Sequence, residues 1–277
     1  YHKIPEALTD IATTGLTERP TDQDKHMNME KYRDFLKDTI RQTIDFTMTA
    51  QKRGIPVPPI EKECGSGDKK IVLPGQEDWD KMKNMSLYDA ILRRKSVRNF
   101  APSSLSLNEL SFLLWATQGV RTVINGHAFR TVPSAGCRHA LETYLAVFRV
   151  ETLEKGIYRY LPLEHNLILV REVPCLESEM SEAAMGQRFA SESAVTFIWT
   201  TIPERMEWRY GEASHKVIAL DAGHVCQNLY LSCGAVGAAT CAIAAYDQGK
   251  ADRLAGVDGK EEFVIYMAPV GKRHSKK

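Results

Sequence analysis

The sequence lacks the features of a secreted, membrane-spanning or nucleic-acid-binding protein. Its six cysteines form no C-x-x-C pair, so free thiols in a reducing cytoplasm are expected rather than a disulfide framework. The N-terminus has no apolar signal-peptide core, and the apolar run that begins at Val195 stops at Pro203, short of the roughly 18 residues that a membrane helix needs. The net charge of +1 offers no field for nucleic acid or an acidic membrane. A cytoplasmic location with no membrane and no nucleic-acid partner is therefore expected.

The motifs of several large enzyme classes are also missing. There is no G-x-G-x-x-G after a strand and no G-x-x-x-x-G-K-[ST], so neither a dinucleotide fold nor a P-loop is indicated. H-E-x-x-H and paired Cys/His spacing are absent, so no metal site is expected. There is no G-x-S-x-G nucleophile elbow. If the protein is an enzyme, a bound organic cofactor is the expected source of its chemistry.

The 277 residues suit one large domain with an appendage. From Asn28 to about Arg53, apolar side chains recur at three- and four-residue spacing, which predicts one amphipathic helix. The stretches 56–59 and 64–68 are rich in proline or glycine and predict an extended linker. We therefore expect an N-terminal arm over residues 1–80 and a compact domain over 81–277.

Helix and strand patterns interleave in the compact part. Ser86 and Ser106 have the spacing of helix caps, and the second is expected to open a helix over Leu107–Gln118. A long apolar helix is expected from about Ser214 to Gly237. Strand patterns cover 143–150, 156–161, 167–173, 195–202, 239–245 and 263–269. No regular βαβ units emerge, so the fold class is expected to be α+β.

Two basic clusters stand out. Arg93-Arg-Lys-Ser-Val-Arg98 closes the helix that Ser86 opens; its cations could complement the helix dipole in solvent or grip a phosphate together with the serine hydroxyl. A second cluster, Lys272 and Arg273, follows the last expected strand. Alone it resembles a frayed tail, but the two clusters together could clamp one phosphate.

Two further segments carry polar or small residues. The stretch 130–136 taken alone predicts an ordinary loop entering a short helix over 137–141, although its small residues would let backbone approach a flat ligand. In the long helix, Asp221, His224 and the pair 227–228 form one polar stripe. For His224, a structural and a functional role are equally open.

Seven segments in this order resemble the FMN-dependent nitroreductase superfamily, and most closely its branch of thiazole/oxazole-forming (azoline) dehydrogenases. The segments are 93–100, 114–119, 130–136, 156–167, 208–211, 220–229 and 268–271. The resemblance spans about residues 84–273 and implies a mostly antiparallel central sheet flanked by helices. It also implies an FMN enzyme that is a homodimer with both flavin sites at the interface. The first 80 residues match no family we can name.

The resemblance implies a role for individual residues. A phosphate, ribityl and pyrimidine site would be formed by Arg93, Arg94, Ser96 and Arg98, with Lys272 and Arg273 completing the phosphate clamp. The isoalloxazine would lie along Pro133, Ser134, Ala135 and Gly136. Backbone N–H groups near the flavin N5 would come from Ala242, Ile243, Ala244 and Ala245.

One departure bears on the reaction. Where azoline dehydrogenases carry a Lys-Tyr pair after a tryptophan, this chain has Arg209 and Tyr210 after Trp208, unless this stretch is only a surface helix turn. An arginine stays charged and cannot act as a base, whereas tyrosine keeps a titratable hydroxyl. The resemblance implies a reductase that takes hydride from NADH or NADPH and reduces a small organic acceptor, and this departure counts against the azoline reaction. The alternatives are oxidation of a peptide azoline or similar substrate, or a non-catalytic flavin-binding subunit.

Overall fold

The computed structural model describes residues 29–30, 32–79, 82 and 84–274, and the chain divides into two compact units, 1–43 and 44–277. In the first unit, helical residues 29–30 and 32–36 precede a 3-10 helix, η1 (Thr39–Gln42). The second unit begins with another 3-10 helix, η2 (Phe46–Met48).

The single helix expected over 28–53 is therefore wrong, and Asn28, its expected cap, lies outside the described residues. Local hydrogen bonds explain the interruption. Thr43 donates its hydroxyl to the Ile40 carbonyl over 2.8 Å, and the Asp45 carboxylate accepts the Thr47 N–H over 2.9 Å. Such bonds between short polar side chains and nearby backbone compete with helix continuation.

The division between the units also differs from the boundary expected near residue 80. Residues from Ile44 onward group with the sheet, and β1 (Lys70–Val72) pairs with β6 (Asn166–Arg171) as an edge strand. Leu73, just after β1, is buried in the core. The stretch expected to be an arm therefore contributes a strand and a core residue, because a three-residue edge strand has too short a pattern to be recognised in the sequence.

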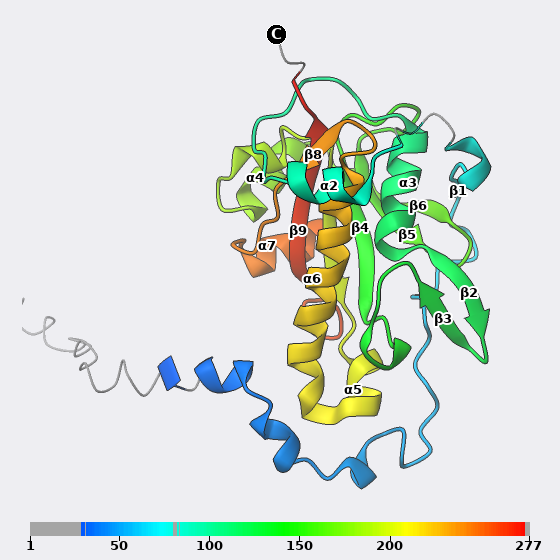
Figure 1. The fold of residues 1–277 in the computed structure, drawn as a ribbon, viewed down its shortest axis with the longest axis vertical. Helices are drawn as coiled ribbons and strands as arrows, with labels where there is room; N and C mark the ends of the chain where they lie inside the picture. The colour runs from blue at the N-terminus through cyan, green and yellow to red at the C-terminus, as the bar shows by residue number, and fades with distance from the viewer. Residues whose placement is uncertain (1–28, 31, 80–81, 83, 275–277) are drawn as a thin grey trace, which may run out of the picture. The chain divides into compact units, whose positions relative to one another are not determined.

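A seven-stranded sheet forms the centre of the second unit (Figure 1). Its strand order is β1-β6-β5-β4-β7-β9-β8, and every neighbouring pair is antiparallel. The strands after β1 are β4 (Leu141–Val147), β5 (Gly156–Leu161), β6 (Asn166–Arg171), β7 (Val195–Thr201), β8 (Ala238–Thr240) and β9 (Phe263–Lys272). The expected α+β class and antiparallel sheet are confirmed.

Helices cover both faces of this sheet. On one face, α3 (Leu107–Gln118) and α6 (Ser214–Ser232) pack on alternate residues of β4 such as Leu145 and Val147. On the other face, α4 (Leu176–Ala183) and α7 (Gln248–Ala255) pack on Tyr144 and Ala146. Because both faces are covered, every residue of β4, β5 and β7 is buried. The two cores fix the strands that carry the candidate site.

Three smaller elements complete the fold. Helix α2 (Leu87–Arg93) lies against α6, and α5 (Glu204–Tyr210) leads into it. A separate hairpin of β2 (Val120–Ile124) and β3 (His127–Arg130) projects from the sheet (Figure 1). The expected helix caps are present: Ser86 accepts the Asp89 N–H over 3.1 Å, and Ser106 forms a full capping box with Glu109.

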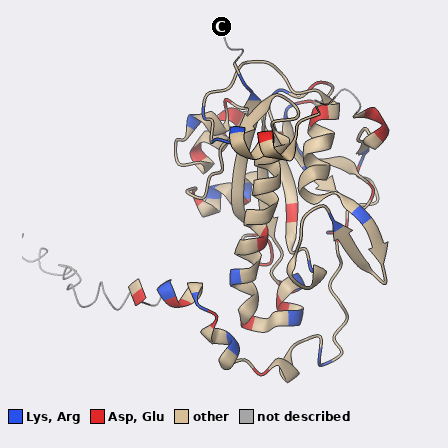
Figure 2. Ribbon diagram, viewed as in Figure 1, with Lys and Arg blue, Asp and Glu red and all other residues tan. Residues whose placement is uncertain are grey.

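Charged residues of both signs are interspersed along the helices and strands (Figure 2). Among the described residues, no helix is both long and apolar enough to cross a membrane. All six cysteines are free thiols.

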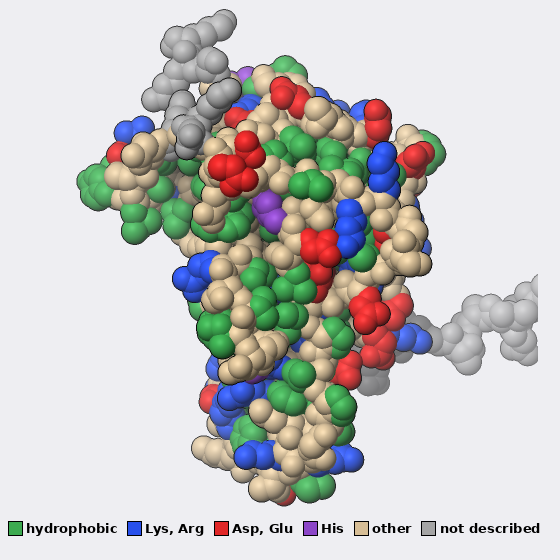
Figure 3. Space-filling model, turned by 90° about the vertical axis from the view of Figure 1, so that its right-hand side faces the viewer, with side chains coloured by type: hydrophobic (Ala, Val, Ile, Leu, Met, Phe, Trp, Pro, Cys, Tyr) green, Lys and Arg blue, Asp and Glu red, His purple; other side chains and the backbone are tan. Residues whose placement is uncertain are grey.

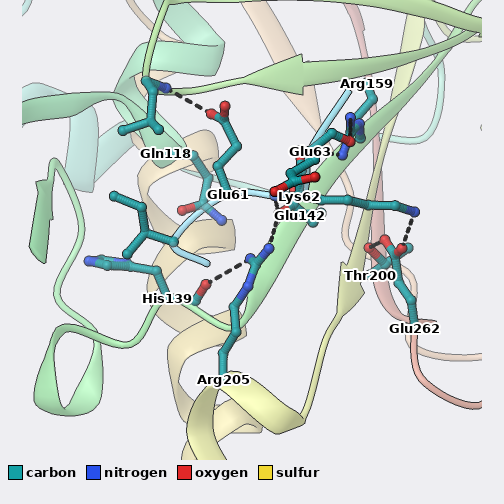
Figure 4. Close-up of polar contacts among 12 residues, drawn as sticks. Glu61, Lys62, Glu63, Gln118, His139, Glu142, Arg159, Thr200, Arg205 and Glu262 are labelled. Carbon is teal, nitrogen blue, oxygen red and sulfur yellow. Dashed lines mark hydrogen bonds and ion pairs between the residues drawn. The ribbon is translucent and has the colours of Figure 1, made fainter. Parts of the chain in front are cut away.

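A segment between the two expected linker stretches is bonded to the sheet (Figure 4). The Lys62 backbone N–H donates to Glu142 over 2.9 Å, and the Lys62 ammonium pairs with Glu262 over 2.5 Å. Arg159 donates to the carbonyls of Lys62 and Glu63. Residues 60–63 are therefore docked on the sheet. The extended, hydrogen-bond-poor linker expected over 64–68 is also wrong, because the Gly65 N–H donates to the Asp68 carboxylate over 2.8 Å and the Asp68 N–H donates to the Gly65 carbonyl over 3.1 Å.

Candidate functional site

The two basic clusters come together at one end of β8 and β9. The Val97 N–H donates to the Thr240 carbonyl over 3.0 Å, and the Ala101 N–H donates to the Lys272 carbonyl over 2.9 Å. Phe100 lies so close to Gly271 that a Cβ there would stand 2.7 Å from the phenylalanine Cβ. The segment after α2 thus runs beside the strand end that carries Lys272 and Arg273.

The cations of these two clusters differ in whether a carboxylate already pairs with them. Arg93 pairs with Asp89 over 2.9 Å, and Lys272 pairs with Glu109. Arg94 instead stacks on the Tyr230 ring at 5.4 Å, Arg98 on Phe189 at 5.8 Å, and the Arg273 Nε donates to the Ala238 carbonyl. Within the described ranges, these last three guanidinium groups have no carboxylate partner. They are the cations available to an external anion.

Tyr230 is a site residue that the sequence reasoning missed. Its hydroxyl lies 2.9 Å from the Ser96 hydroxyl and accepts the Ala242 N–H over 2.9 Å. It therefore joins the first basic cluster to the segment after β8. The polar stripe did not indicate it, because Tyr230 lies nine residues after Asp221 and so on nearly the opposite side of the helix.

The segment 242–245 is only partly a source of backbone donors. The strand expected over 239–245 ends at Thr240, and Ile243 makes an isolated bridge with Met267. The N–H groups of Ala242 and Ile243 are bonded to Tyr230 and Met267. Among the described residues, the N–H groups of Ala244 and Ala245 have no such partner. The expected donation toward a flavin therefore rests on these two alanines.

The loop 133–136 meets the Arg209–Tyr210 pair. A short 3-10 helix, η4 (Ala135–Cys137), replaces the helix expected over 137–141, because β4 already begins at Leu141. Gly136 has φ of 56°, and a Cβ there would stand 2.7 Å from the Tyr210 hydroxyl and 2.9 Å from the Arg209 Cδ. Both the backbone conformation and the close contact require glycine.

Arg209 and Tyr210 end α5 and are half-buried. The Arg209 guanidinium lies 5.7 Å from the centre of the Tyr210 ring. The neighbouring Trp208 is fixed by its indole N–H, which donates to the Ile55 carbonyl over 2.8 Å, and by Arg138 stacked on its ring at 5.2 Å. This stretch is therefore the partly exposed last turn of α5, and it packs against the loop.

Asp221 connects the long helix to the same loop. Its carboxyl is buried and lies beside the Ser134 side chain and the Ala135 N–H. Burial raises the pKa of Asp221, while those two groups and His224 oppose the rise. His224 itself is exposed, with its Nδ1 4.0 Å from the Asp221 Oδ1. The member of the stripe that faces the site is thus Asp221, which the sequence reasoning did not place in the site.

Two groups of residues can now be distinguished along α6. The basic end comprises Arg94, Ser96, Arg98, Tyr230 and residues 272–273. The loop end comprises residues 133–136 with Arg209, Tyr210 and Asp221. Asp221 and Tyr230 are nine residues apart, which corresponds to about 13–14 Å along a helix and to nearly opposite sides of it. On α6, the two ends therefore take their residues from nearly opposite sides of the helix.

A cavity of about 340 Å³ adjoins the loop end. It is lined by residues of β2, β3 and the following loop: Arg121, Phe129, Arg130, Thr131, Val132, Pro133, Ser134, Cys137 and His139. Its volume falls in the range of sites for small organic molecules. Pro133 and Ser134 belong to both the cavity and the loop.

Comparison with known proteins gives one family. A model of the Nitroreductase family matches residues 91–272. MJ1384 of Methanocaldococcus jannaschii, which is named as a nitroreductase, is 30% identical over 204 residues, covering 74% of this chain and 96% of that protein. The trifolitoxin-processing protein TfxB of Rhizobium leguminosarum bv. trifolii is 28% identical over 145 residues, covering 49% of this chain and 39% of TfxB.

Two solved structures share the fold. A structure from Ralstonia eutropha JMP134, described as a nitroreductase, aligns with a TM-score of 0.62 and 25% identity, covering 80% of this chain and all of that one. A chain of the Escherichia coli microcin synthetase McbBCD complex aligns with a TM-score of 0.56 and 16% identity, covering 92% and 96% of the two chains. The second likeness is one of fold alone.

Proposed function

The chain belongs to the nitroreductase family and is an oxidoreductase of that family; from this premise we propose that it uses FMN to take hydride from NADH or NADPH and to reduce a small organic acceptor. The observation that carries the proposal is the meeting of the two basic clusters at the end of β8 and β9. Three guanidinium groups there have no carboxylate partner in the described part of the chain. A phosphate would satisfy all three.

The residues present fit FMN. Arg94, Ser96, Arg98, Lys272 and Arg273 would hold the phosphate, although Lys272 would have to share its charge with Glu109. Arg93 is a weaker candidate because Asp89 already pairs with it. The loop 133–136 is expected to lie along the flavin ring. Because Gly136 has no Cβ, other groups can approach the backbone of this loop closely.

Bound FMN would supply two-electron chemistry at its ring, and the chain would supply position and protons. Asp221 holds the loop through Ser134 and Ala135. The Tyr210 hydroxyl, close to Gly136, is the group that could deliver a proton to a reduced acceptor. Arg209 cannot be a base, and its fixed positive charge would stabilise negative charge that develops nearby.

A homodimer would complete the site. Because the basic end and the loop end lie on nearly opposite sides of α6, one flavin would contact the basic end of one subunit and the loop end of its partner. Exposed apolar side chains on α2 support such an interface: Leu87, Tyr88, Ile91 and Leu92 are 57–73% exposed. Figure 3 shows hydrophobic side chains gathered in patches on the face that it views. The role of an N-terminal arm on the partner, now limited to residues 1–43, and the cytoplasmic location stay predictions.

The proposal is tested by flavin content and reduction. The purified protein should carry FMN or bind added FMN, and its flavin absorbance should bleach when NADPH or NADH is added without oxygen. Tight FMN binding with no bleaching would favour the non-catalytic subunit. Absence of any flavin binding would contradict the proposal.

A second candidate is oxidation of a peptide azoline or a similar substrate. It is favoured by the sequence similarity to TfxB, whose name assigns it to trifolitoxin processing. The charged Arg209 in the lysine position opposes it. In either direction, Tyr210→Phe should slow turnover roughly 10-fold or more while leaving FMN affinity unchanged, since one proton-transfer group is lost. Steady-state turnover beside a flavin titration checks this, and equal turnover would leave Tyr210 a packing residue.

A further inference from the structure

The cavity beside the loop end contains two arginines and no acidic residue in its lining. Arg121, on β2, is anchored by its Nε, which donates to the Arg130 carbonyl over 3.2 Å. Within the described part of the chain, its two terminal nitrogens have no partner. The Arg121 side chain is thus held at the cavity with the forked face of its guanidinium still available.

Arg130, which also lines the cavity, carries a second positive charge beside that of Arg121. It is 3% exposed, and its terminal nitrogens donate to the Gln118 side chain over 3.0 Å and to the Ile60 carbonyl over 2.7 Å. Its Nε has no hydrogen-bond partner, and no carboxylate pairs with it among the described residues. A buried cation without a direct ion pair is costly.

Arg130 is affected both by burial and by carboxylates that lie near it without direct contact. Burial lowers the pKa of Arg130 to about 10, although Glu142 and Glu61 act in the opposite direction. Burial likewise lowers the pKa of His139 to about 3, so the imidazole in the cavity lining is neutral near pH 7. The lining therefore carries two positive charges and no negative one, and an anion would lower its energy.

The remaining polar groups of the lining already have partners. The Thr131 hydroxyl donates to the Trp115 carbonyl, the Cys137 thiol to the Ala128 carbonyl, and the Ser134 hydroxyl accepts the His139 N–H. The rest of the lining is apolar and partly aromatic, with Phe129, Val132 and Pro133. The ligand chemistry that matches is a flat apolar body with one anionic group.

We propose that this cavity binds a flat organic carboxylate, with Arg121 gripping the carboxylate through its guanidinium fork and Arg130 adding a second positive charge. Phe129, Val132 and Pro133 contact the apolar body. The identification of this ligand as the electron acceptor rests on the proposed function, because Pro133 and Ser134 also belong to the loop expected along the flavin. The binding itself does not depend on that function.

Calorimetric titration of the protein as isolated, with benzoate and with its neutral analogue benzamide, tests the site. Benzoate should bind saturably and benzamide at least ~10-fold more weakly, because only the carboxylate can pair with the guanidinium fork. Arg121→Gln should weaken benzoate binding roughly 10- to 100-fold, and Arg121→Lys by less, since the charge remains but the fork is lost. Arg188→Gln is the matched control, because Arg188 is an exposed arginine paired with Glu192 away from the cavity.

Three results would overturn the proposal: no saturable benzoate binding, equal binding of benzoate and benzamide, or unchanged binding in Arg121→Gln with the thermal midpoint of unfolding preserved. A fourth is displacement of benzoate by added FMN, which would make the cavity part of the flavin site. The site and the proposed function can fail separately. If benzoate binds but NADH and NADPH do not reduce the flavin, the carboxylate site is supported and the proposed reductase is refuted.

Discussion

The basic end and the loop end differ in how their charged and polar groups are partnered. At the basic end, Arg94, Arg98 and Arg273 lie near the surface, stacked on rings or bonded to one carbonyl, with no acid beside them. At the loop end, the buried Asp221 carboxyl lies beside Ser134 and Ala135, and Gly136 has Tyr210 directly against it. One end leaves charge available, whereas the other uses its polar groups to hold a shape.

The difference follows from what lies beneath each end. The loop end continues into the most buried polar network of the sheet, where Arg205 pairs with Glu142 over 2.6 Å and donates to the His139 carbonyl over 3.3 Å (Figure 4). At the basic end, the strands β8 and β9 are mostly buried, but Arg94, Arg98 and Arg273 themselves are exposed. A phosphate can therefore enter the basic end from solvent, while the loop end is preformed. The changes below test this contrast.

The largest effect is expected from breaking the buried pair. Arg205→Met leaves the Glu142 carboxylate buried without its cation and should lower the free energy of unfolding by about 3–5 kcal/mol. The control Arg188→Met removes an exposed pair and should cost about 0–0.5 kcal/mol. Urea unfolding of both variants measures the difference. Equal losses of unfolding free energy would show that the buried Arg205–Glu142 pair does not stabilise the loop end more than an exposed pair would.

A second test uses pH. Because the folded-state pKa of His139 is about 3, the unfolded chain binds a proton below about pH 6.5 that the folded chain does not, so stability falls as the pH drops. At pH 5 this contribution is about 2 kcal/mol. His139→Gln should remove that part of the acid sensitivity, as unfolding free energies between pH 5 and pH 7.5 would reveal. An unchanged acid slope would mean that the histidine is not held neutral.

The basic end should instead respond through ligand affinity. Arg94→Ala should weaken FMN binding roughly 10- to 100-fold, because a charge-assisted partner of the phosphate is lost, with little change in stability. Arg93→Ala should have a smaller effect, since Asp89 already neutralises that side chain. Fluorescence titration with FMN measures both. An equal loss of FMN affinity in the two variants would show that pairing with a carboxylate does not decide which arginine contributes to FMN binding.

The smallest effect compares two glycines. Gly136→Ala and Gly126→Ala both place a side chain at positive φ, 56° and 75°, which costs about 1 kcal/mol. Only Gly136 has a neighbour, the Tyr210 hydroxyl, so its variant should be destabilised further and should turn over more slowly. If both variants behave alike in urea unfolding and in turnover, Tyr210 is not fixed against the loop.

Local signals in the sequence predicted the local structure. The helix over Leu107–Gln118 has the expected bounds because its capping box and Gly119 mark both ends. The strand over Gly156–Leu161 likewise has the expected bounds, although both of its faces are buried. The hairpin of β2 and β3 was missed even though Asn125 and Gly126, both at positive φ, form the kind of turn that favours hairpins.

The candidate site was only partly predictable. The approach of the two basic clusters was expected and is present, whereas the ion pairs of Arg93 and Lys272 use Asp89 and Glu109, which the sequence indicated only as residues of helix caps. The contact of Gly136 with Tyr210 joins residues far apart in the chain, so no spacing rule could reveal it. Asp221 was recognised as polar on an apolar helix, but its partner in the loop became visible only in three dimensions. The functional roles of these residues stay predictions.

The most direct test of the account is an absorbance spectrum of the purified protein, recorded before and after anaerobic addition of NADPH and then NADH. The account predicts flavin bands that bleach with at least one donor, because the basic end holds FMN and the preformed loop end leaves its ring accessible. Bands that persist with both donors would contradict the reductase. A protein that shows no flavin even after FMN is added would contradict the assignment of the basic end itself.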